Sequence, residues 1–436
     1  MNDGMKPGAP SLLAEFFNSR IDLEKIFQTA VPRIANMALR ALAMGSKFVL
    51  MIVLARILEP AQIGLYGLFT ATLYFSVIFI GVDYYTYSQR ELLSVPKDRW
   101  SFVLQHQVIA IGLLYLLILP LQLPLFYFNL LPSKFLYWFY ILLLFEHISQ
   151  ELNRILVAMQ RPLMASIVLF IRMGAWVWLI IPMMWFNHDT RNLNAIFLAW
   201  FVGTATASFV GGIMVWRGSR PWRWWPIDRA WILRGYKTGL MFFLATLSFM
   251  TLRTIDRYIV NFLVGPSLLG VYTLFMGLAM TVISLMEPAV FSFLYPPIVS
   301  AYQKGDRITY RTLMREMGIW TIALSIALAA IVGIFTPFVL HWIDRPLYTE
   351  HLSLIWLLLS VTVIYAGGMI PHYGLYAMRA DRSIMFAHLS SLVVFFVVVA
   401  LLASTTPLYT VPYALLAAFT WMGIYKLWRY SCLRSD

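Results

Sequence analysis

Cysteine and charged residues are both scarce in this sequence. Cys432 is the only cysteine among 436 residues, which excludes an intrachain disulfide and a cysteine metal cluster. Only 12% of the residues are charged, whereas 61% are hydrophobic, and a soluble protein of this length cannot bury so much apolar surface. No Gly-rich loop followed by Lys-Ser or Lys-Thr is present, which argues against nucleotide hydrolysis, and no histidine spacing is typical of a metal site.

Long apolar stretches recur along nearly the whole chain, and each is long enough to cross a hydrocarbon core of about 30 Å. They must be helical, because lipid offers no hydrogen-bond partner to a backbone N–H or C=O group. We therefore predict an all-α polytopic membrane protein. Its twelve transmembrane helices are expected at residues 31–57, 63–84, 101–121, 135–157, 163–185, 194–216, 238–264, 268–294, 317–340, 352–377, 384–404 and 408–428.

Lys and Arg are divided unequally between the two sides of this topology. With an even number of helices both termini share one side, and that side carries most of the basic residues outside the helices. The opposite loops contain only Lys134, Arg191 and Arg345. This asymmetry predicts cytoplasmic termini. The formal charge of +13 is therefore mainly a topology signal, and the scattered basic residues do not suggest a nucleic-acid partner.

The chain divides at its longest polar break, the basic connector 217–237. We expect a six-helix lobe at 31–216, a second at 238–428, and a cytoplasmic tail at 429–436. Residues 1–30 contain no apolar core of signal-peptide type, so we expect no cleaved signal. Their apolar side chains can form an interfacial amphipathic helix, and a loosely ordered cytoplasmic tail is the alternative.

The two lobes share a short motif. One offset of 206 residues relates ILEPAQIGLYGLF to LVGPSLLGVYTLF through Pro60 and Pro266, Gly64 and Gly270, Tyr66 and Tyr272, and Phe69 and Phe275. Because each lobe has six helices, both repeats begin on the same side. They are therefore parallel, with a pseudo-two-fold axis along the membrane normal. Such a repeat is typical of a transporter whose path lies between its halves.

Basic residues inside the predicted helices are the main candidates for substrate binding. Each costs about 2.5–3.5 kcal/mol at the centre of a membrane helix, so pairing, water or a bound anion must offset them. Arg33, Arg40 and Lys47 recur every seven residues and share one face of the first helix, about 10 Å apart along its axis. Arg253 is the equivalent of Lys47 at the 206-residue offset, and Arg172 lies near mid-depth.

This ladder of cations favours a water-filled path for an anionic group such as phosphate or pyrophosphate. The alternative is that Arg33 extends to the interface while Arg40 and Lys47 form internal salt bridges.

Acidic residues are fewer inside the helices. Glu146 lies near mid-depth and can carry a coupling proton or neutralise Lys47 or Arg172, and we favour neutralisation. Asp256 and Arg257 lie near the outer end of the seventh helix, where a structural charge pair and a role in transport are both open. No cofactor and no metal are expected, and a proton or sodium gradient can supply the energy.

Two segments resemble the polysaccharide exporter family. Residues 53–92 resemble its start, where a first helix ending in an LAR-L pattern leads into a Gly-Tyr turn and an Arg-containing second helix end. Residues 254–285 resemble its Asp-plus-basic pattern followed by Gly-x-Tyr, and YPP before AYQKGD resembles its eighth-helix end. The resemblance covers 31–100 and 240–310 as motifs and the rest as hydropathy.

This family includes the Wzx-type flippases and belongs to the multidrug/oligosaccharidyl-lipid/polysaccharide (MOP) exporter superfamily. The resemblance implies alternating access by two lobes in the bacterial plasma (inner) membrane. Its substrate would be an undecaprenyl-pyrophosphate-linked oligosaccharide, such as an O-antigen or another surface polysaccharide unit. It also implies a cationic cavity, in which Arg40, Lys47, Arg172 and Arg253 hold suitable positions, and partners among other polysaccharide assembly proteins.

Three other functions fit a many-helix membrane protein. A multidrug exporter of the same superfamily should carry buried acids for cationic drugs, whereas the first helix here is rich in cations. A glycan polymerase, ligase or lipid-dependent glycosyltransferase should have a large outer loop with catalytic residues, which this topology lacks. A lipid-II-type flippase has the same general features as our choice. We therefore expect a transporter rather than an enzyme.

Overall fold

The computed structural model of the chain describes residues 12–435, and their side chains except at positions 12–30, 32, 33, 241, 242, 244, 245, 248, 249 and 435. The described residues form helices and loops without a strand. The predicted all-α class is therefore confirmed. Ten segments of the described chain are long and apolar enough to cross a membrane.

Each of the twelve predicted helices has a counterpart in the structure. The first six are α1 (Leu12–Ile57), α2 (Pro60–Gly81), α4 (Trp100–Ile118), α6 (Leu136–Ala158), a helix formed by α7 (Pro162–Phe170), η4 (Ile171–Ala175) and α8 (Val177–Phe186), and α9 (Leu193–Gly218). The others are α10 (Arg229–Met286), which provides two, continued by η6 (Glu287–Phe291) and α11 (Ser292–Gln303), then α12 (Arg307–Ile343), α14 (Ser353–Ala377), α15 (Asp381–Leu402) and α16 (Pro407–Ser435).

Short helices join these elements. They are α3 (Tyr85–Ser94), η1 (Lys97–Arg99), η2 (Pro120–Gln122), α5 (Pro124–Tyr127), η3 (Ser133–Phe135), η5 (His188–Thr190) and α13 (Pro346–Glu350). Proline is the first residue of α2, α5, α7, α13 and α16, because a helix needs no N–H from its first residue and the ring presets φ.

The long helix α10 contains the break that separates the seventh predicted helix from the eighth. Gly265 has φ 77° and ψ 177°, a conformation open to glycine and not to residues with a Cβ, and Pro266 then starts the next helix. The ten apolar segments include Met250–Gln303, which this break divides in two, and leave out α6, whose middle carries buried polar residues. When Met250–Gln303 is counted as two helices and α6 is added, the ten apolar segments become the twelve predicted helices.

Several helices are longer than predicted, among them α12, which begins at Arg307 rather than at 317. Residues 12–30 begin α1 and continue directly into the first predicted helix, whereas residues 1–11 lie outside the described part of the chain. α10 begins at Arg229, so only 219–228 of the expected connector is not helical, and Asp228 caps α10 by accepting a hydrogen bond from the Trp231 N–H. α16 reaches Ser435, which makes the expected tail part of a helix.

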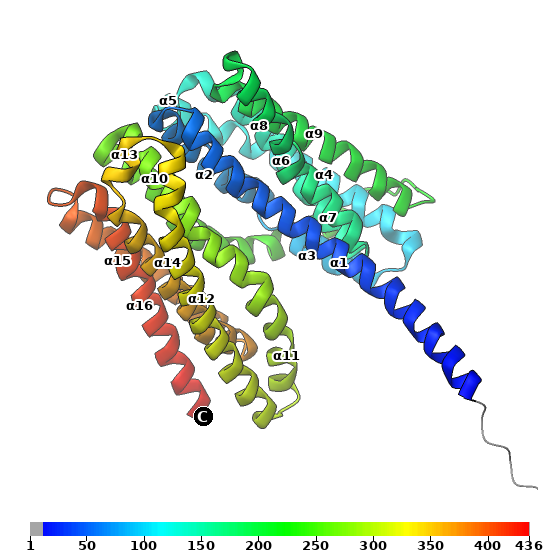
Figure 1. Ribbon diagram of the computed structural model, residues 1–436. Helices are drawn as coiled ribbons and strands as arrows, with labels where there is room; N and C mark the ends of the chain where they lie inside the picture. The colour runs from blue at the N-terminus through cyan, green and yellow to red at the C-terminus, as the bar shows by residue number, and fades with distance from the viewer. Residues whose placement is uncertain (1–11, 436) are drawn as a thin grey trace, which may run out of the picture.

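The helices form two bundles that lie against each other at one end and diverge toward the other (Figure 1). α1 to α9 form one bundle, and most of α10 to α16 forms the second. We call the end near α5 and α13 the joined end, and the end at which the C-terminus lies the open end. Most of α1 runs along the first bundle, and its N-terminal part extends past the open end.

The repeated motif is itself the crossing of α2 and α10 near the joined end. A Cβ on Gly64 would lie 2.2 Å from the Pro266 carbonyl oxygen, and a Cβ on Gly270 would lie 1.9 Å from the Pro60 carbonyl oxygen. Each half therefore presents a glycine to the matching proline of the other half. Only glycine permits so close a backbone approach, so the 206-residue repeat marks a two-fold-related contact between the bundles.

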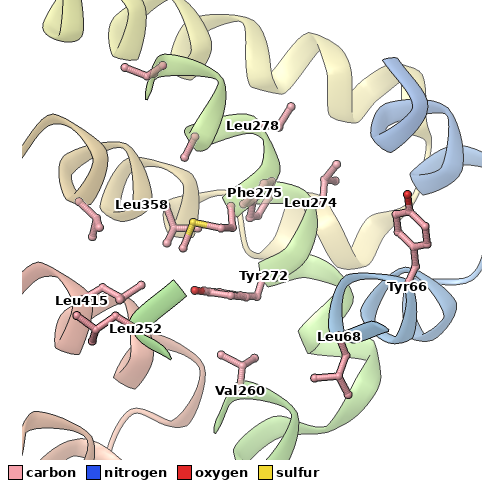
Figure 2. Close-up of a cluster of buried hydrophobic side chains, with 14 of the residues drawn as sticks. Tyr66, Leu68, Leu252, Val260, Tyr272, Leu274, Phe275, Leu278, Leu358 and Leu415 are labelled. Carbon is pink, nitrogen blue, oxygen red and sulfur yellow. The ribbon is translucent and has the colours of Figure 1, made fainter. Parts of the chain in front are cut away.

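Packing around this crossing is continuous from one bundle to the other. Figure 2 shows Tyr66 and Leu68 of α2 beside the α10 segment that carries Tyr272 and Leu274, with the Tyr272 hydroxyl directed toward Leu252. All of these side chains belong to one buried hydrophobic cluster. The crossing therefore lies inside a shared core.

Charged and aromatic side chains bridge the bundles at the joined end. Arg345 Nη1 lies 2.9 Å from Glu59 Oε1. Arg56 Nη1 donates to the Trp342 carbonyl oxygen at 2.6 Å, and the Arg56 guanidinium lies 4.4 Å from the centroid of the Trp342 ring. The Trp342 ring stacks on Trp185 with centroids 6.4 Å apart. We call these five residues the joined-end latch.

Candidate functional site

Three of the predicted site residues meet in the middle of the first bundle. Lys47 comes from α1, Glu146 from α6 and Arg172 from η4. Arg172 Nη1 lies 3.7 Å from Glu146 Oε2, and the Trp200 indole N–H donates to Glu146 Oε1 at 2.6 Å. Glu146 is fully buried, so its carboxylate is enclosed by the arginine and the indole. Of the two basic residues it was expected to neutralise, it pairs with Arg172.

Lys47 lies beside this pair and close to the charge of Glu146, but no acid of the described residues lies within salt-bridge distance of it. Its Nζ donates to the Tyr74 hydroxyl and lies 5.2 Å from the Trp200 ring centroid and 4.9 Å from that of Tyr74. The aromatic faces stabilise the ammonium by cation–π attraction, worth about 0.5–2 kcal/mol each. The Lys47 ammonium has three N–H donors, and the Tyr74 hydroxyl accepts from one of them, so Lys47 keeps capacity for a further anionic partner.

The backbone of η4 places Arg172 in this cluster. Residues 171–175 form a π-helical turn, a feature that recurs at functional sites because it re-aims side chains. Gly174 in this turn packs on Ser46, since a Cβ there would lie 3.0 Å from Ser46 Oγ. The Trp178 indole N–H donates to the same oxygen at 2.9 Å. These contacts hold the turn against α1, close to Lys47.

The predicted stripe on α1 continues from Lys47 toward the open end. Arg40 is exposed, and its Nε donates to Ser166 Oγ at 3.1 Å, while Ser166 in turn donates to the Asn36 side chain. Among the residues that the structure describes, neither Arg40 nor Lys47 forms a salt bridge, so the alternative of internal salt bridges is not what is observed for them. The Arg33 side chain lies outside the described set.

The remaining predicted residues lie in the second bundle. Arg257 Nη1 contacts both oxygens of Asp256, at 3.1 and 3.2 Å, and the Tyr272 hydroxyl donates to Asp256 Oδ2 at 2.6 Å. Asp256 therefore has Arg257 as its ion partner. Arg253 is exposed, and Arg253, Asp256, Arg257 and Tyr365 line a small cavity of about 70 Å³.

The predicted residues thus form two groups rather than one site. Lys47, Glu146 and Arg172 form the first-bundle cluster, with Arg40 further along α1. Asp256 and Arg257 form a pair beside Arg253 in the second bundle. Arg253 and Lys47, equivalent by sequence offset, lie on α10 and α1 respectively.

Sequence reasoning missed residues that only folding makes important. Trp200 and Tyr74 enclose Lys47 and Glu146, but a tryptophan and a tyrosine in apolar helices carry no signal of that role. Lys426 was not among the residues singled out from the sequence. Its helix, α16, continues to Ser435, and Lys426 is 0% exposed.

Comparisons with known proteins match the fold and not the sequence. No family model matches this chain, and no curated protein matches it. An inward-facing structure of a multidrug resistance MATE family transporter of the MOP superfamily has a TM-score of 0.70 at 14% identity, over 92% of this chain and 99% of that one. An outward-facing structure of such a transporter has a TM-score of 0.63 at 15% identity, over 93% and 97%.

A third solved structure is a MOP superfamily transporter from Pyrococcus furiosus, described as having a binding pocket of reversed polarity that suggests a different function. Its TM-score is 0.57 at 14% identity, over 94% of this chain and 96% of that one.

Proposed function

We propose that this multi-pass membrane protein, which has the fold of the MATE transporters of the MOP superfamily, is a flippase for lipid-linked oligosaccharides. In this proposal an undecaprenyl-pyrophosphate-linked sugar unit, such as an O-antigen or another surface polysaccharide unit, crosses the bacterial plasma membrane by alternating access. Both termini, and hence the open end, would face the cytoplasm. The resemblance of residues 53–92 and 254–285 to the polysaccharide exporter family supports this choice of substrate.

One observation carries the proposal: among the described residues, no acid lies within salt-bridge distance of Arg40 or Lys47 of α1. Arg40 is exposed and Lys47 half-buried on one helical face, and neither forms a salt bridge among the described residues. Each unpaired cation at membrane depth costs about 2.5–3.5 kcal/mol on insertion scales. A bound pyrophosphate offsets that cost, because its oxygens accept several charge-assisted hydrogen bonds from ammonium and guanidinium groups.

The geometry of the two bundles suggests how such a substrate would move. The pyrophosphate would enter at the open end, contact Arg40 first and Lys47 next, and remain close to the face of Arg253. The sugars would stay in water between the proposed lobes 31–216 and 238–428, and the isoprenoid tail would stay in lipid. The Gly64 and Gly270 crossing would then be the fulcrum, because each glycine there contacts the matching proline of the other half.

The multidrug exporter is the main alternative, since two of the solved structures with this fold are described as multidrug resistance transporters. A cationic drug needs an accessible carboxylate. Glu146 is buried and already accepts from Trp200 and Arg172, and Asp256 is bound by Arg257 and Tyr272. The reversed pocket polarity described for the Pyrococcus furiosus protein is consistent with a fold that serves substrates of different charge.

The decisive experiment deletes the gene in its host and measures surface polysaccharide and lipid-linked intermediates in each leaflet. Loss of one surface glycan, with its lipid-linked unit retained on the cytoplasmic face, supports the proposal and identifies the sugar. Units that reach the outer face but remain unpolymerised would indicate an enzyme acting after the flip instead. Increased drug sensitivity with normal surface glycan would support the multidrug alternative.

Complementation of that deletion tests the cation path. We expect Lys47→Ala and Arg40→Ala to reduce glycan export at normal protein level, and Arg253→Ala to do so if the second wall also contacts the substrate. Lys97→Ala is the control, because Lys97 is exposed in the short helix η1 outside the bundles. Full export by the Lys47 and Arg253 variants would rule out the cation path.

A further inference from the structure

Three basic side chains meet inside the second bundle, away from the residues discussed above. Lys426 lies on α16, His372 on α14 and His388 on α15, and the two imidazole centroids are 6.3 Å apart. Lys426 is 0% exposed, and its Nζ has no hydrogen-bond partner. His372 Nδ1 is buried and also has none. We call these three residues the basic cluster.

The members of the basic cluster repel one another when charged. Protonated His372 lies close to the positive charges of Lys426 and His388, and protonated His388 lies close to that of Lys426. The sequences of α14 and α16 contain no acid, and α15 has only Asp381, exposed at its first residue. A fully charged basic cluster in this packing would therefore be strongly unfavourable.

The acids of the neighbouring elements have other partners: on α10, which packs against α14, α15 and α16, Asp256 pairs with Arg257. The charge of the Glu287 carboxylate, on η6, is felt by the Tyr373 and Tyr365 side chains rather than by the basic cluster. α12 carries Arg315 and Glu316 on its exposed side and directs Met314 and Met317 inward. Arg429 of α16 donates to Ser383 of α15.

The helices around the basic cluster have a built-in point of deformation. α14 and α16 approach closely at Gly368 and Gly423, since a Cβ on Gly368 would lie 3.5 Å from the Gly423 Cα. Pro371 interrupts the hydrogen bonding of α14 next to His372, and such a position bends easily. Water can reach Lys426 only if α14, α15 and α16 separate there.

The same two helices also reach the cavity beside Arg253. Tyr365 of α14 and Phe419 of α16 line that cavity, and each lies seven residues before a member of the basic cluster, His372 and Lys426 respectively. Seven residues are about two helical turns and about 10 Å, so each pair shares one helical face. A shift of α14 against α16 at the basic cluster therefore moves the wall of the cavity.

We propose that His372, His388 and Lys426 form a proton-binding site that couples proton exchange to the movement of the second bundle. The neutral cluster is compatible with the tight packing observed, and the protonated cluster requires α14 and α16 to part and admit water. Proton binding at this site does not depend on the proposed function. Only the claim that proton exchange drives the transport of a lipid-linked sugar rests on the proposed function. Glu146 and Asp256, the carboxylates considered from the sequence, are by contrast already engaged in ion pairs.

Spin–spin distances in lipid nanodiscs test this site without any glycan lipid. Labels at Ser94→Cys and Lys304→Cys, in a Cys432→Ser background, report the separation of the two bundles at the open end, because both positions are exposed there. We expect a second distance population to grow reversibly as the pH is lowered from about 8 to about 4, because proton binding by the basic cluster favours the separated helices. Failure of glycan export in cells would leave this result unaffected.

Variants of the basic cluster decide the assignment. Lys426→Met with His372→Gln and His388→Gln should remove the pH response. Lys426→Arg should hold the acidic population even at high pH, because an arginine does not lose its proton. Ser391→Ala is the packing control, since Ser391 is buried on α15 and bonds only the His388 carbonyl. The triple variant is expected to lose the acidic population, whereas Lys426→Arg is expected to keep it at every pH. A general folding defect would not produce opposite effects in the two variants.

Two results would overturn the proposal. A triple variant that titrates like the parent would show that the proton binds elsewhere. A parent protein that responds to replacing chloride by gluconate at fixed pH, and not to pH itself, would show that the basic cluster is an anion site.

Discussion

At the scale of the residue, buried charge is what distinguishes this chain from an ordinary apolar bundle. Glu146 and Arg172 are partners in a space that excludes water, and Trp200 satisfies the second carboxylate oxygen. Removing one member of such a pair leaves the other buried without compensation, which costs more than the pair contributes to stability. Asp83, buried at the junction of α2 and α3, has no comparably close ion partner among the described residues.

The first residue-scale prediction concerns Glu146→Gln. We expect the free energy of unfolding to fall by about 3 kcal/mol, because Arg172 then remains buried without its counter-ion. SDS-induced unfolding in mixed micelles measures this. Glu316→Gln, at an exposed position on α12, should change the value by less than about 0.5 kcal/mol. Equal stability of the two variants would contradict the assigned ion pair.

The second concerns Asp83→Asn and pH. Burial raises the pKa of the Asp83 carboxyl above its ordinary value, so its ionised form destabilises the folded protein. This penalty is absent below about pH 4, where the carboxyl is protonated in both states, and grows as pH rises through the raised pKa. The melting temperature of Asp83→Asn relative to the parent should therefore be higher at neutral pH than in acid. A difference in melting temperature that does not change with pH would contradict the predicted destabilisation by the ionised Asp83 carboxyl.

At the scale of the element, close backbone contact explains why the repeat consists of proline and glycine. Gly64 packs against the carbonyl group of Pro266, and Gly270 packs against the carbonyl group of Pro60. A side chain at either position must displace the facing helix. Gly277, also on α10, has no such reason, since a Cβ there would make ordinary contact with Met51 at 3.5 Å.

We therefore expect Gly64→Ala and Gly270→Ala each to destabilise the protein by about 1–3 kcal/mol through overpacking. Gly277→Ala, on the same helix as Gly270, and Gly112→Ala, with open space around it, should be neutral or stabilising by about 0.5–1 kcal/mol. Melting temperatures of the four variants in detergent provide the comparison. A similar gain in all four would mean that the crossing is looser than the structure indicates.

At the scale of the whole molecule, two bundles joined at one end and open at the other need a contact that keeps the joined end shut. The joined-end latch provides it. The pair of Glu59 and Arg345 is 67% and 30% exposed, so its contribution is at most about 1 kcal/mol. Arg56 bonds the Trp342 carbonyl and lies over its ring, which adds about 0.5–2 kcal/mol.

Arg56→Ala should therefore shift the protein toward separation at the joined end more strongly than Glu59→Ala, by about fivefold in population for each 1 kcal/mol lost. Spin labels at Tyr127→Cys and Leu401→Cys, both exposed and on different bundles, measure the separation. The charge-swapped double variant Glu59→Arg with Arg345→Glu should regain the parent distances. Unchanged distances in Arg56→Ala would remove the joined-end latch from the mechanism.

The sequence by itself determined the twelve helices, since a bilayer forces every apolar span to be helical. The membrane fixes these helices locally, so no distant contact is needed to predict them. The repeat of Pro60 and Gly64 at Pro266 and Gly270 is also visible in the sequence, but the crossing that these residues form is a contact between distant segments.

Only the tertiary structure decided the partners of the charges. Glu146 pairs with Arg172, and Asp256 with Arg257, while Lys426 is buried beside two histidines. These outcomes depend on a π-turn in η4, on the extension of α16 and on which helix faces meet. Side-chain direction and helix rotation are set by packing between segments far apart in the chain, and helix periodicity alone does not encode them.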